Sequence, residues 1–360
     1  MAIVLAVFSI VLGTAIIQIA ISVTTGFEKQ IQSKITGFVS DVQITNYFSE
    51  ALDTLQPLGL PPHFCKSIMQ LNSNVQSCYP YLQRSAILKS SSFLEGIELK
   101  GINSEWDSTF IYRSLKKGRL IRWVAGKVSN EILVSSKIAD KLVLDVGDKV
   151  RLYFWEREKV RVRVVNICGI YETGLLEFDQ RMVFCDIQML QKLLGWQPHQ
   201  YQGIEIQLKK PNSSQERINF AAQINAQLGT SCKAYAADEL YQDIFQWLSL
   251  QHQHVFFILV FMIIVAIINM ASAMIILIIE KISFIGLLKA LGASNFFIQK
   301  LFLFQAFIII SLSVLGGNLV ATLLLSIQQK FQFITMDPDA YFVKTVPVDW
   351  PLFEFLKANL

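Results

Sequence analysis

Three long stretches of the chain contain no charged side chain. Residues 1–25, 255–279 and 301–327 lack Asp, Glu, Lys and Arg. A helix needs about 20 residues to cross a hydrocarbon core of about 30 Å, and a charge at its centre opposes insertion by about 2.5–3.5 kcal/mol. With 52% hydrophobic and only 17% charged residues, the composition excludes an ordinary soluble protein. We therefore expect three membrane-spanning helices, at 1–25, 254–279 and 301–327.

The first uncharged run begins at the initiator methionine, so a secretory signal is the alternative to a span. However, a basic segment before the run is missing, the run exceeds the usual apolar core of a signal, and no clear cleavage site precedes Gly26. We favour a span. Because no basic residue precedes the run, we also expect the natural start to lie upstream.

The motifs that mark nucleotide-binding, hydrolytic and metal-dependent enzymes are missing. The sequence contains no G-x-x-x-x-G-K-[ST] phosphate loop, no G-x-S-x-G and no H-E-x-x-H. Its four histidines are scattered, and on a helix His252 and His254 would point about 200° apart. The formal charge of +4 is not gathered into a basic run, which disfavours nucleic acid as a partner. We expect no enzymatic activity, no cofactor and no metal site in this chain.

Cysteine is scarce, and its five positions show no metal-like spacing. We expect most of these residues to be buried apolar side chains. If the domain that carries them faces an oxidising compartment, Cys65 and Cys78 could form a loop disulfide. The odd count leaves at least one thiol free.

Residues 26–253 have ordinary polarity and enough length for one large domain or two smaller ones. Their first part continues the first span as a polar helix, because Phe27, Ile31 and Ile35 recur at helical spacing. We expect strands at 41–47, 83–88, 94–102, 182–185 and 204–208, a strand passing into a helix at 131–144, and a hairpin of 149–154 with 160–170. We expect helices at 64–71, 187–194, 214–228 and 238–253. The predicted fold is an α+β membrane protein whose mixed α/β domain is inserted between the first two spans.

The stretch EKISFIGLLKALGAS, residues 280–294, lies between the second and third uncharged runs. It is too short to form a domain, and we expect an amphipathic helix at the membrane surface. A stripe that would lie on the membrane or against the third span consists of Phe284, Leu287, Leu288 and Leu291. A second patch, suited to a protein groove, consists of Ile282, Ile285 and Lys289. The alternative is a plain interfacial helix that leads the chain back into the membrane.

Five segments together resemble a known family. They are GFEKQIQSKITGFVSDVQI, GIELKGI, ILVSSKIADKLVLDVGDKV, GIYETGLLEFDQRMVFCDI and IINMASAMIILIIEKISFIGLLKALGASNFFIQKLFLFQAFIII. In this order, and across nearly the whole chain, they resemble the FtsX-like ABC permeases. Among these, the match is to the lipoprotein-releasing (Lol-type) permeases of bacterial inner membranes.

The resemblance implies a multi-pass inner-membrane protein with four spans and a large periplasmic domain at 26–253. The loop 280–300 would be cytoplasmic and would seat on a separate ATPase, and 328–360 would be a periplasmic segment that leads to a fourth span. The residues that couple to the ATPase would be Glu280, Lys281, Ile282, Ile285, Gly286, Leu288, Lys289, Leu291 and Gly292. Possible walls of a substrate cavity would be Gly26 and Phe27.

By the same resemblance, the partners would be an ABC ATPase, a second permease subunit in a homodimer or heterodimer, membrane lipid, a lipoprotein substrate and a periplasmic lipoprotein chaperone. ATP hydrolysis in the ATPase subunit would drive the periplasmic domains as a mechanical stroke that releases the lipoprotein.

Two features depart from the family pattern. A fourth hydrophobic run does not occur before Leu360, so we expect a chain truncated before the fourth span. The hairpin at 155–159 has only a tight turn, whereas Lol-type permeases that grip the chaperone carry a longer hook there. We therefore expect a partner permease to recruit the chaperone. Two other functions stay open: a MacB-like exporter permease for peptides or toxins, and a membrane-anchored sensor with an extracytoplasmic domain.

Overall fold

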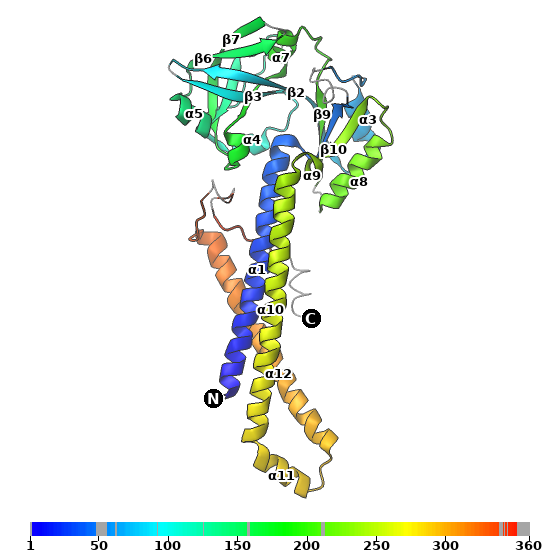
Figure 1. The fold of residues 1–360 in the computed structure, drawn as a ribbon, viewed down its shortest axis with the longest axis vertical. Coiled ribbons are helices and arrows are strands. Elements are labelled where there is room, and N and C mark those ends of the chain that lie inside the picture. Colours follow the sequence, from blue (N-terminus) through cyan, green and yellow to red (C-terminus); the bar gives the residue numbers. More distant parts are fainter. Residues whose placement is uncertain are drawn as a thin grey trace. The chain divides into compact units, whose positions relative to one another are not determined.

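The structure is a computed structural model that describes residues 2–47, 56–61, 63–91, 93–124, 126–156, 159–209, 213–337, 341, 343 and 345–350. The chain forms two compact units. We call residues 2–30, 244–336 and 343–350 the helical unit, and residues 31–243 with 337–341 the large domain. Figure 1 labels their elements. The tip of the predicted hairpin, 157–158, and the end of the predicted segment 328–360, residues 351–360, lie outside the described residues.

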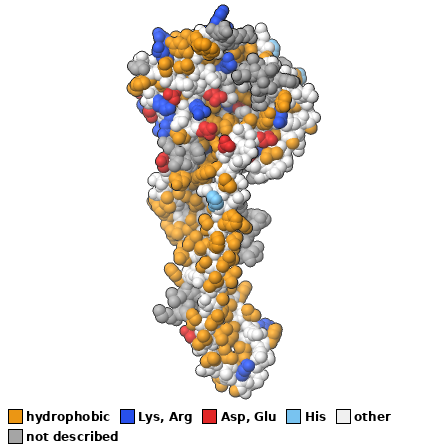
Figure 2. Space-filling model, viewed as in Figure 1, with side chains coloured by type: hydrophobic (Ala, Val, Ile, Leu, Met, Phe, Trp, Pro, Cys, Tyr) orange, Lys and Arg blue, Asp and Glu red, His pale blue; other side chains and the backbone are white. Residues whose placement is uncertain are grey.

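The helical unit is built on three helices that are long and apolar enough to cross a membrane. They are α1 (Ala2–Val39), α10 (Gln242–Glu280) and α12 (Asn295–Phe331), and a shorter helix, α11 (Ile282–Ala290), connects the last two. Hydrophobic side chains cover most of the visible surface of the long helices (Figure 2). The predicted continuation of the first span as a polar helix is confirmed, because α1 runs without a break to Val39.

Small residues let the long helices approach closely. A Cβ atom on Gly317 of α12 would lie 2.7 Å from Thr14 Cβ and 2.8 Å from Val11 O of α1. Asn269 Nδ2 of α10 donates a hydrogen bond of 2.7 Å to Ser9 Oγ of α1. Close backbone packing and interhelical hydrogen bonds are the interactions that hold helices together in lipid, where burial of apolar surface contributes little.

One part of the large domain is a four-stranded antiparallel sheet. Its order is β10 (Cys232–Ala236), β1 (Val42–Asn46), β9 (Gly203–Leu208) and the first half of β2 (Val75–Lys89). Helices α3 (Phe64–Leu71) and α8 (Ser214–Asn225) belong to this part. Cys65 of α3 and Cys78 of β2 form a disulfide, which confirms the bond that the sequence left open. The other three cysteines are free and buried.

The second half of β2 enters a closed barrel. Around the barrel, β2 pairs with β3 (Leu94–Ile102), β3 with β8 (Met182–Asp186), β8 with β5 (Glu131–Ser135), β5 with β7 (Lys159–Tyr171), β7 with β6 (Lys149–Glu156), and β6 with β2 again. Closure leaves no free edge among these strands. A short strand, β4 (Leu115–Gly118), extends the sheet at β7.

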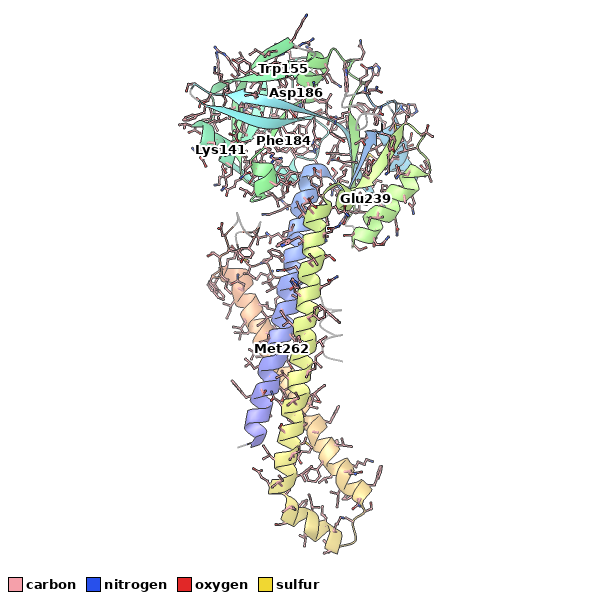
Figure 3. The ribbon with its side chains drawn as sticks, in the orientation of Figure 1. Lys141, Trp155, Phe184, Asp186, Glu239 and Met262 are labelled. Carbon is pink, nitrogen blue, oxygen red and sulfur yellow. A yellow bond between two sulfur atoms is a disulfide. The ribbon has the colours of Figure 1, made fainter. Side chains whose placement is uncertain are left out.

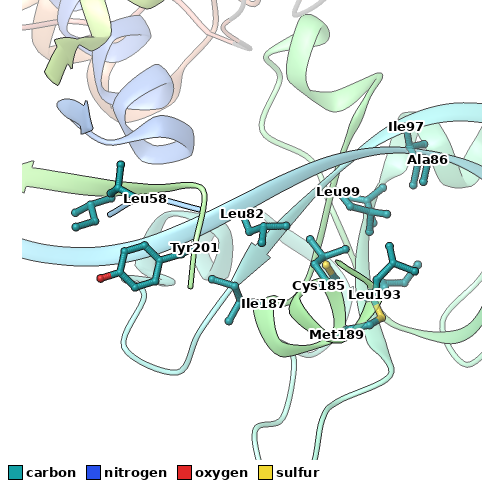
Figure 4. Packing of buried hydrophobic residues seen from close by; sticks show 14 of the residues in the cluster. Leu58, Leu82, Ala86, Ile97, Leu99, Cys185, Ile187, Met189, Leu193 and Tyr201 are labelled. Atoms are coloured by element: carbon teal, nitrogen blue, oxygen red, sulfur yellow. The ribbon is translucent and has the colours of Figure 1, made fainter. Parts of the chain in front are cut away.

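Alternate residues of the barrel strands fill its core. Leu82, Ala86, Ile97, Leu99 and Cys185 pack together with side chains of α7 (Ile187–Leu194), as Figure 4 shows. Helix α5 (Ser136–Leu142) also packs on this core through its buried side chains. The outward side chains of the same strands are therefore the ones available to other molecules.

Most of the predicted elements are present. Strand β3 and helix α7 have the predicted bounds, and β5 passes into α5 as expected. Three predictions were incomplete: β2 begins at Val75, α8 ends at Asn225, and the last predicted helix is divided into α9 (Ala237–Leu240) and α10. Strands β4 and β10 were not predicted. The α+β fold, with a mixed domain between the first two long helices, is confirmed.

Candidate coupling site

Helix α11 occupies the predicted amphipathic stretch. Helix α10 ends at Glu280, and α11 begins two residues later. Gly292, with a φ of 91°, then turns the chain out of the helix, and the hydroxyl of Ser294 accepts a hydrogen bond from Phe297 N, which begins α12. The left-handed conformation favours glycine, and a serine at the N-cap satisfies a free helix donor. The sequence thus ends α11 and begins α12 within a few residues (Figure 1).

A small apolar cluster holds α11 against its neighbours. Leu277 of α10 and Ile298 and Phe302 of α12 are buried together, and Ile285 of α11 packs on them. Leu288, one turn further along, is half-buried. This packing differs from the prediction for one residue, Ile285. Ile285 had been assigned to the patch offered to a protein groove, whereas the structure turns it toward its own chain. The other apolar stripe stays largely exposed.

Seven of the nine predicted coupling residues are exposed. They are Glu280, Lys281, Ile282, Gly286, Lys289, Leu291 and Gly292. Ile282 and Leu291 have exposed fractions of 65% and 77%, which is high for aliphatic side chains of this size. The remaining two, Ile285 and Leu288, are half-buried. Exposed apolar side chains beside one or two cations are typical of surfaces that dock on another protein or on lipid headgroups.

A hollow of about 200 Å³ lies between α11 and α12. It is lined by Lys281, Phe284, Leu301, Phe302 and Gln305. The walls are mainly apolar and Lys281 contributes a cation, so the hollow could accept an apolar side chain with an acidic neighbour.

The predicted cavity residues Gly26 and Phe27 are covered by their own chain. A Cβ atom on Gly26 would lie 2.9 Å from Asp349 N, and the Phe27 ring lies 5.8 Å from that of Trp247, between centroids. The carboxylate of Asp349 also forms an ion pair with Lys29. A substrate could reach Gly26 only if the segment at 345–350 moved away.

The carboxyl end of α1 is fixed inside the large domain by a group of residues that the sequence did not reveal. Lys100 Nζ donates hydrogen bonds to Phe38 O, near the last turn of α1, and to Glu205 Oε1 of β9. Gln43 Nε2 donates a hydrogen bond of 2.8 Å to the same carboxylate oxygen. Both members of the ion pair are fully buried. We call Phe38, Gln43, Lys100 and Glu205 the α1 joint.

Charge and geometry both favour this arrangement. A cation next to the carbonyl end of a helix is stabilised by the partial negative charge there. Burial raises the pKa of Glu205, and the nearby Lys100 cation and the hydrogen bond from Gln43 oppose that rise. The pair therefore stays buried only because each charge has the other.

Aromatic rings surround the same turn of α1. The Phe38 ring stacks on that of Phe178 with centroids 4.5 Å apart, and lies 5.3 Å from Phe110 and 6.0 Å from Phe184, which is labelled in Figure 3. A Cβ atom on Gly37 would lie 2.5 Å from the Phe110 ring, so only glycine lets this ring approach. Such ring pairs stabilise by about 0.5–1.5 kcal/mol each beyond their burial.

The points where the chain enters and leaves the large domain are joined by pairing. Strand β1, which follows α1, pairs along its length with β10, which precedes α9 and α10. Ala237 N donates to Asp41 O at 2.9 Å, and the buried Arg217 Nη2 donates to Asp238 Oδ1 at 2.8 Å. Glu239 of α9, labelled in Figure 3, accepts a hydrogen bond of 2.8 Å from Ala236 N, the residue before the helix. The two connections therefore leave from adjacent strands of one sheet.

The described residues offer little for catalysis. They contain no group of three or more His, Cys, Asp or Glu side chains that could hold a metal ion. Burial raises the pKa of the Cys168 thiol to about 12 and raises that of Cys185 as well, which keeps both thiols unreactive.

Comparisons with known proteins bear on both units. Residues 3–223 match the family model described as MacB-like periplasmic core domain, and residues 256–353 match the model described as FtsX-like permease C-terminal. The lipoprotein-releasing system transmembrane protein LolE of Haemophilus influenzae is 23% identical over 82% of this chain and 70% of its own length. The corresponding LolC protein of Xylella fastidiosa is 22% identical over 95% of this chain and 83% of its own length.

Among solved structures, the periplasmic region of MacB from Actinobacillus actinomycetemcomitans matches with a TM-score of 0.38 at 15% identity. The match covers 56% of this chain and 91% of that one.

Proposed function

The chain belongs to the FtsX-like permeases with a MacB-like periplasmic core domain, and from this premise we propose that it is the permease subunit of an ABC transporter that releases lipoproteins from the bacterial inner membrane. A separate ATPase subunit would supply the energy, and a second permease subunit would complete the transporter. The lipoprotein substrate is suggested by relatives that are named for lipoprotein release.

The observation that carries the mechanical part of the proposal is the construction of α1. This single helix begins among the long apolar helices and ends in the α1 joint of the large domain. A buried ion pair and stacked rings fix its last turn, so a displacement of the helix is passed on to the sheet instead of being absorbed by a loop. Force transmission by rigid elements needs such a fixed end.

Helix α11 would receive the input. Its exposed side carries Ile282 and Lys289, while Ile285 packs on the apolar cluster of α10 and α12. We propose that the exposed side seats in a groove of the ATPase subunit, with an acidic group of the ATPase opposite Lys289. Glu280, Lys281, Gly286, Leu291 and Gly292 would border this contact.

The coupling contact can be tested with charge substitutions on α11. In a complex of the permease and its ATPase in lipid nanodiscs, Ile282→Asp or Lys289→Glu should lower permease-stimulated ATP hydrolysis at least tenfold. Gln299→Glu is the matched control, because Gln299 is an exposed residue of α12 near the same end. Full stimulation in both α11 variants would refute the assignment. Ile285→Leu should behave like the control, since a leucine can still fill the cluster.

The substrate class can be tested by depletion. If the chain releases lipoproteins, cells depleted of it should retain outer-membrane lipoproteins in the inner membrane. Unchanged lipoprotein sorting would rule out lipoproteins as the substrate. If the chain instead exports peptides or toxins, its depletion should cause them to accumulate inside the cell.

Recruitment of a periplasmic chaperone is a separate question. Because only residues 157–158 connect β6 and β7, we assign this recruitment to the partner permease. Pull-down of the chaperone by this chain alone would contradict that assignment.

A further inference from the structure

The outer surface of the barrel carries an unusual row of apolar side chains. On neighbouring strands, Gly96 pairs with Ile87, Ile87 with Tyr153, and Tyr153 with Val162. Directly paired residues point to the same side of a sheet. Ile87 has an exposed fraction of 48% and Val162 one of 42%, so this row faces away from the barrel core.

Adjacent rows continue the same surface. Trp155 pairs with Val160, and Arg151 pairs with Val164. Trp155, labelled in Figure 3, is 76% exposed. We call this surface the apolar face; its exposed members are Ile87, Leu94, Trp155, Val160, Val162 and Val164. Soluble domains rarely expose apolar side chains in such a continuous group unless they bind something there.

The apolar face is hollowed into a groove of about 720 Å³. Binding sites for small molecules commonly have volumes of about 300–1,000 Å³ and are mainly apolar with a few polar groups. Gly96 lies on the floor of the groove, and a Cβ atom built on it would meet nothing within 4 Å. The missing side chain at this position therefore leaves space that a ligand can fill.

The charges at the groove determine which occupant fits. Lys89 and Arg181 line it, and Arg181 lies near the carboxyl group of Glu98, which also lines it. Lys89 also pairs directly with Arg151 on the neighbouring strand, and like charges in this position destabilise a sheet. An anion between them would remove that repulsion.

The one carboxyl group in the groove lining, that of Glu98, lies near Arg181 and away from Lys89. Glu98 is half-buried; burial raises its pKa, and the Lys100 and Arg181 cations oppose that rise. A second copy of this chain placed on the apolar face would bring further cations against Lys89 and Arg151. The charge pattern thus disfavours self-association and favours an anionic ligand.

We propose that this groove binds a single-chain anionic lipid, with its acyl chain on the apolar face over Gly96 and its acidic group at the paired cations Lys89 and Arg151. The site is separate from the ATPase contact. It does not depend on lipoproteins being the substrate, since any permease with this barrel surface could hold such a lipid.

A photoreactive fatty acid tests this proposal. The full chain in nanodiscs is exposed to palmitate with a diazirine near the end of its chain, and the labelled peptides are identified by mass spectrometry. We expect label on the peptides that contain residues 85–98 and 150–164. Gly96→Trp should fill the groove and lower this labelling at least fivefold. The matched control is Gly229→Trp, which places the same side chain in open space elsewhere in the domain.

Charge is tested separately. Lys89→Glu with Arg151→Glu should lower labelling to the level obtained with the uncharged fatty alcohol that carries the same diazirine. Because both residues lie at the protein surface, this variant provides a second test if Gly96→Trp does not fold. Absence of label from these peptides, undiminished labelling of a folded Gly96→Trp variant, or equal labelling by acid and alcohol would each overturn the proposal. Intact stimulation of the ATPase in the groove variants would show that the lipid site and the ATPase contact are independent of each other.

Discussion

Removal of one charge from the α1 joint should destabilise the large domain far more than removal of both. Lys100 and Glu205 are fully buried and in contact. In Lys100→Met, the Glu205 carboxylate would lose its cation, and its pKa, already raised by burial, would rise further. Loss of one member of such a pair destabilises proteins by about 3–5 kcal/mol, because the other charge is left buried. We expect a loss of this order in Lys100→Met and in Glu205→Gln.

The double variant Lys100→Met with Glu205→Gln should recover most of that loss. The substituted amide side chain would be neutral, and its oxygen could still accept the hydrogen bond that Gln43 donates to Glu205 in the native chain. In a double-mutant cycle of these variants, we therefore expect a coupling energy of at least about 2 kcal/mol between Lys100 and Glu205. The double variant should lose much less stability than the sum of the losses in the two single variants.

The assay is thermal and chemical unfolding of the purified full chain, combined with hydrogen exchange in β1 and β9. The control is Lys141→Met, which removes a lysine whose ion pair with Glu95 is partly exposed; exposed pairs contribute about 0–1 kcal/mol. Additive losses in the cycle, or single losses as small as that of the control, would refute the claim that the pair fixes the end of α1.

Three further predictions concern single sites. Reduction of the Cys65–Cys78 bond, which closes a loop with a sequence separation of 13, should lower stability by about 3 kcal/mol, measured by melting with and without reductant; equal melting temperatures would contradict a stabilising bond. Gly26→Ala should speed hydrogen exchange of the Asp349 amide, which donates to Ser22 O, and an unchanged rate would show that the segment is not seated on Gly26. Burial raises the pKa of Asp41 from its ordinary value of 3.8 to about 6. The stability that the raised pKa of Asp41 contributes is therefore fully present below about pH 4 and is lost as pH rises through 6. Asp41→Asn should therefore be more stable than the native chain above pH 6, by roughly 2–3 kcal/mol, with no advantage near pH 4 in denaturant titrations.

Local signals were sufficient to predict many elements. Strand β3 alternates apolar Ile97 and Leu99 with polar Glu98 and Lys100. Helix α7 is preceded by its N-cap Asp186, labelled in Figure 3, whose carboxylate accepts a hydrogen bond from Gln188 N. Gly195 ends the same helix in the left-handed conformation. Such features are read from neighbouring residues alone. Strand β4 has two lysines within four residues, so its sequence is typical of a turn, and only its pairing with β7 makes it a strand.

Long-range features were beyond the reach of the sequence. Closure of the barrel depends on β6 pairing with β2, more than 60 residues away in sequence, and no local pattern selects that partner. Lys100 reads as a solvated lysine on a strand, and its burial depends on a carboxylate from β9. Helix α11 has apolar residues on both faces, so periodicity could not decide that Ile285 faces inward; the positions of Leu277 and Ile298 decide it.

The two ends of the proposed pathway differ in how firmly they are held. Three buried residues from α10 and α12 support α11, and much of its apolar surface is exposed. By contrast, the last turn of α1 has a buried ion pair, a carbonyl bound by Lys100 and a stack of rings. A weakly held input helix can adopt the position that a partner imposes, because the free energy needed to shift it is small. A firmly held output end must move together with the sheet that contains β1 and β9. Under the proposed function, this asymmetry suits a transmission element, and we propose that the α1 joint serves in coupling as its firmly held output end.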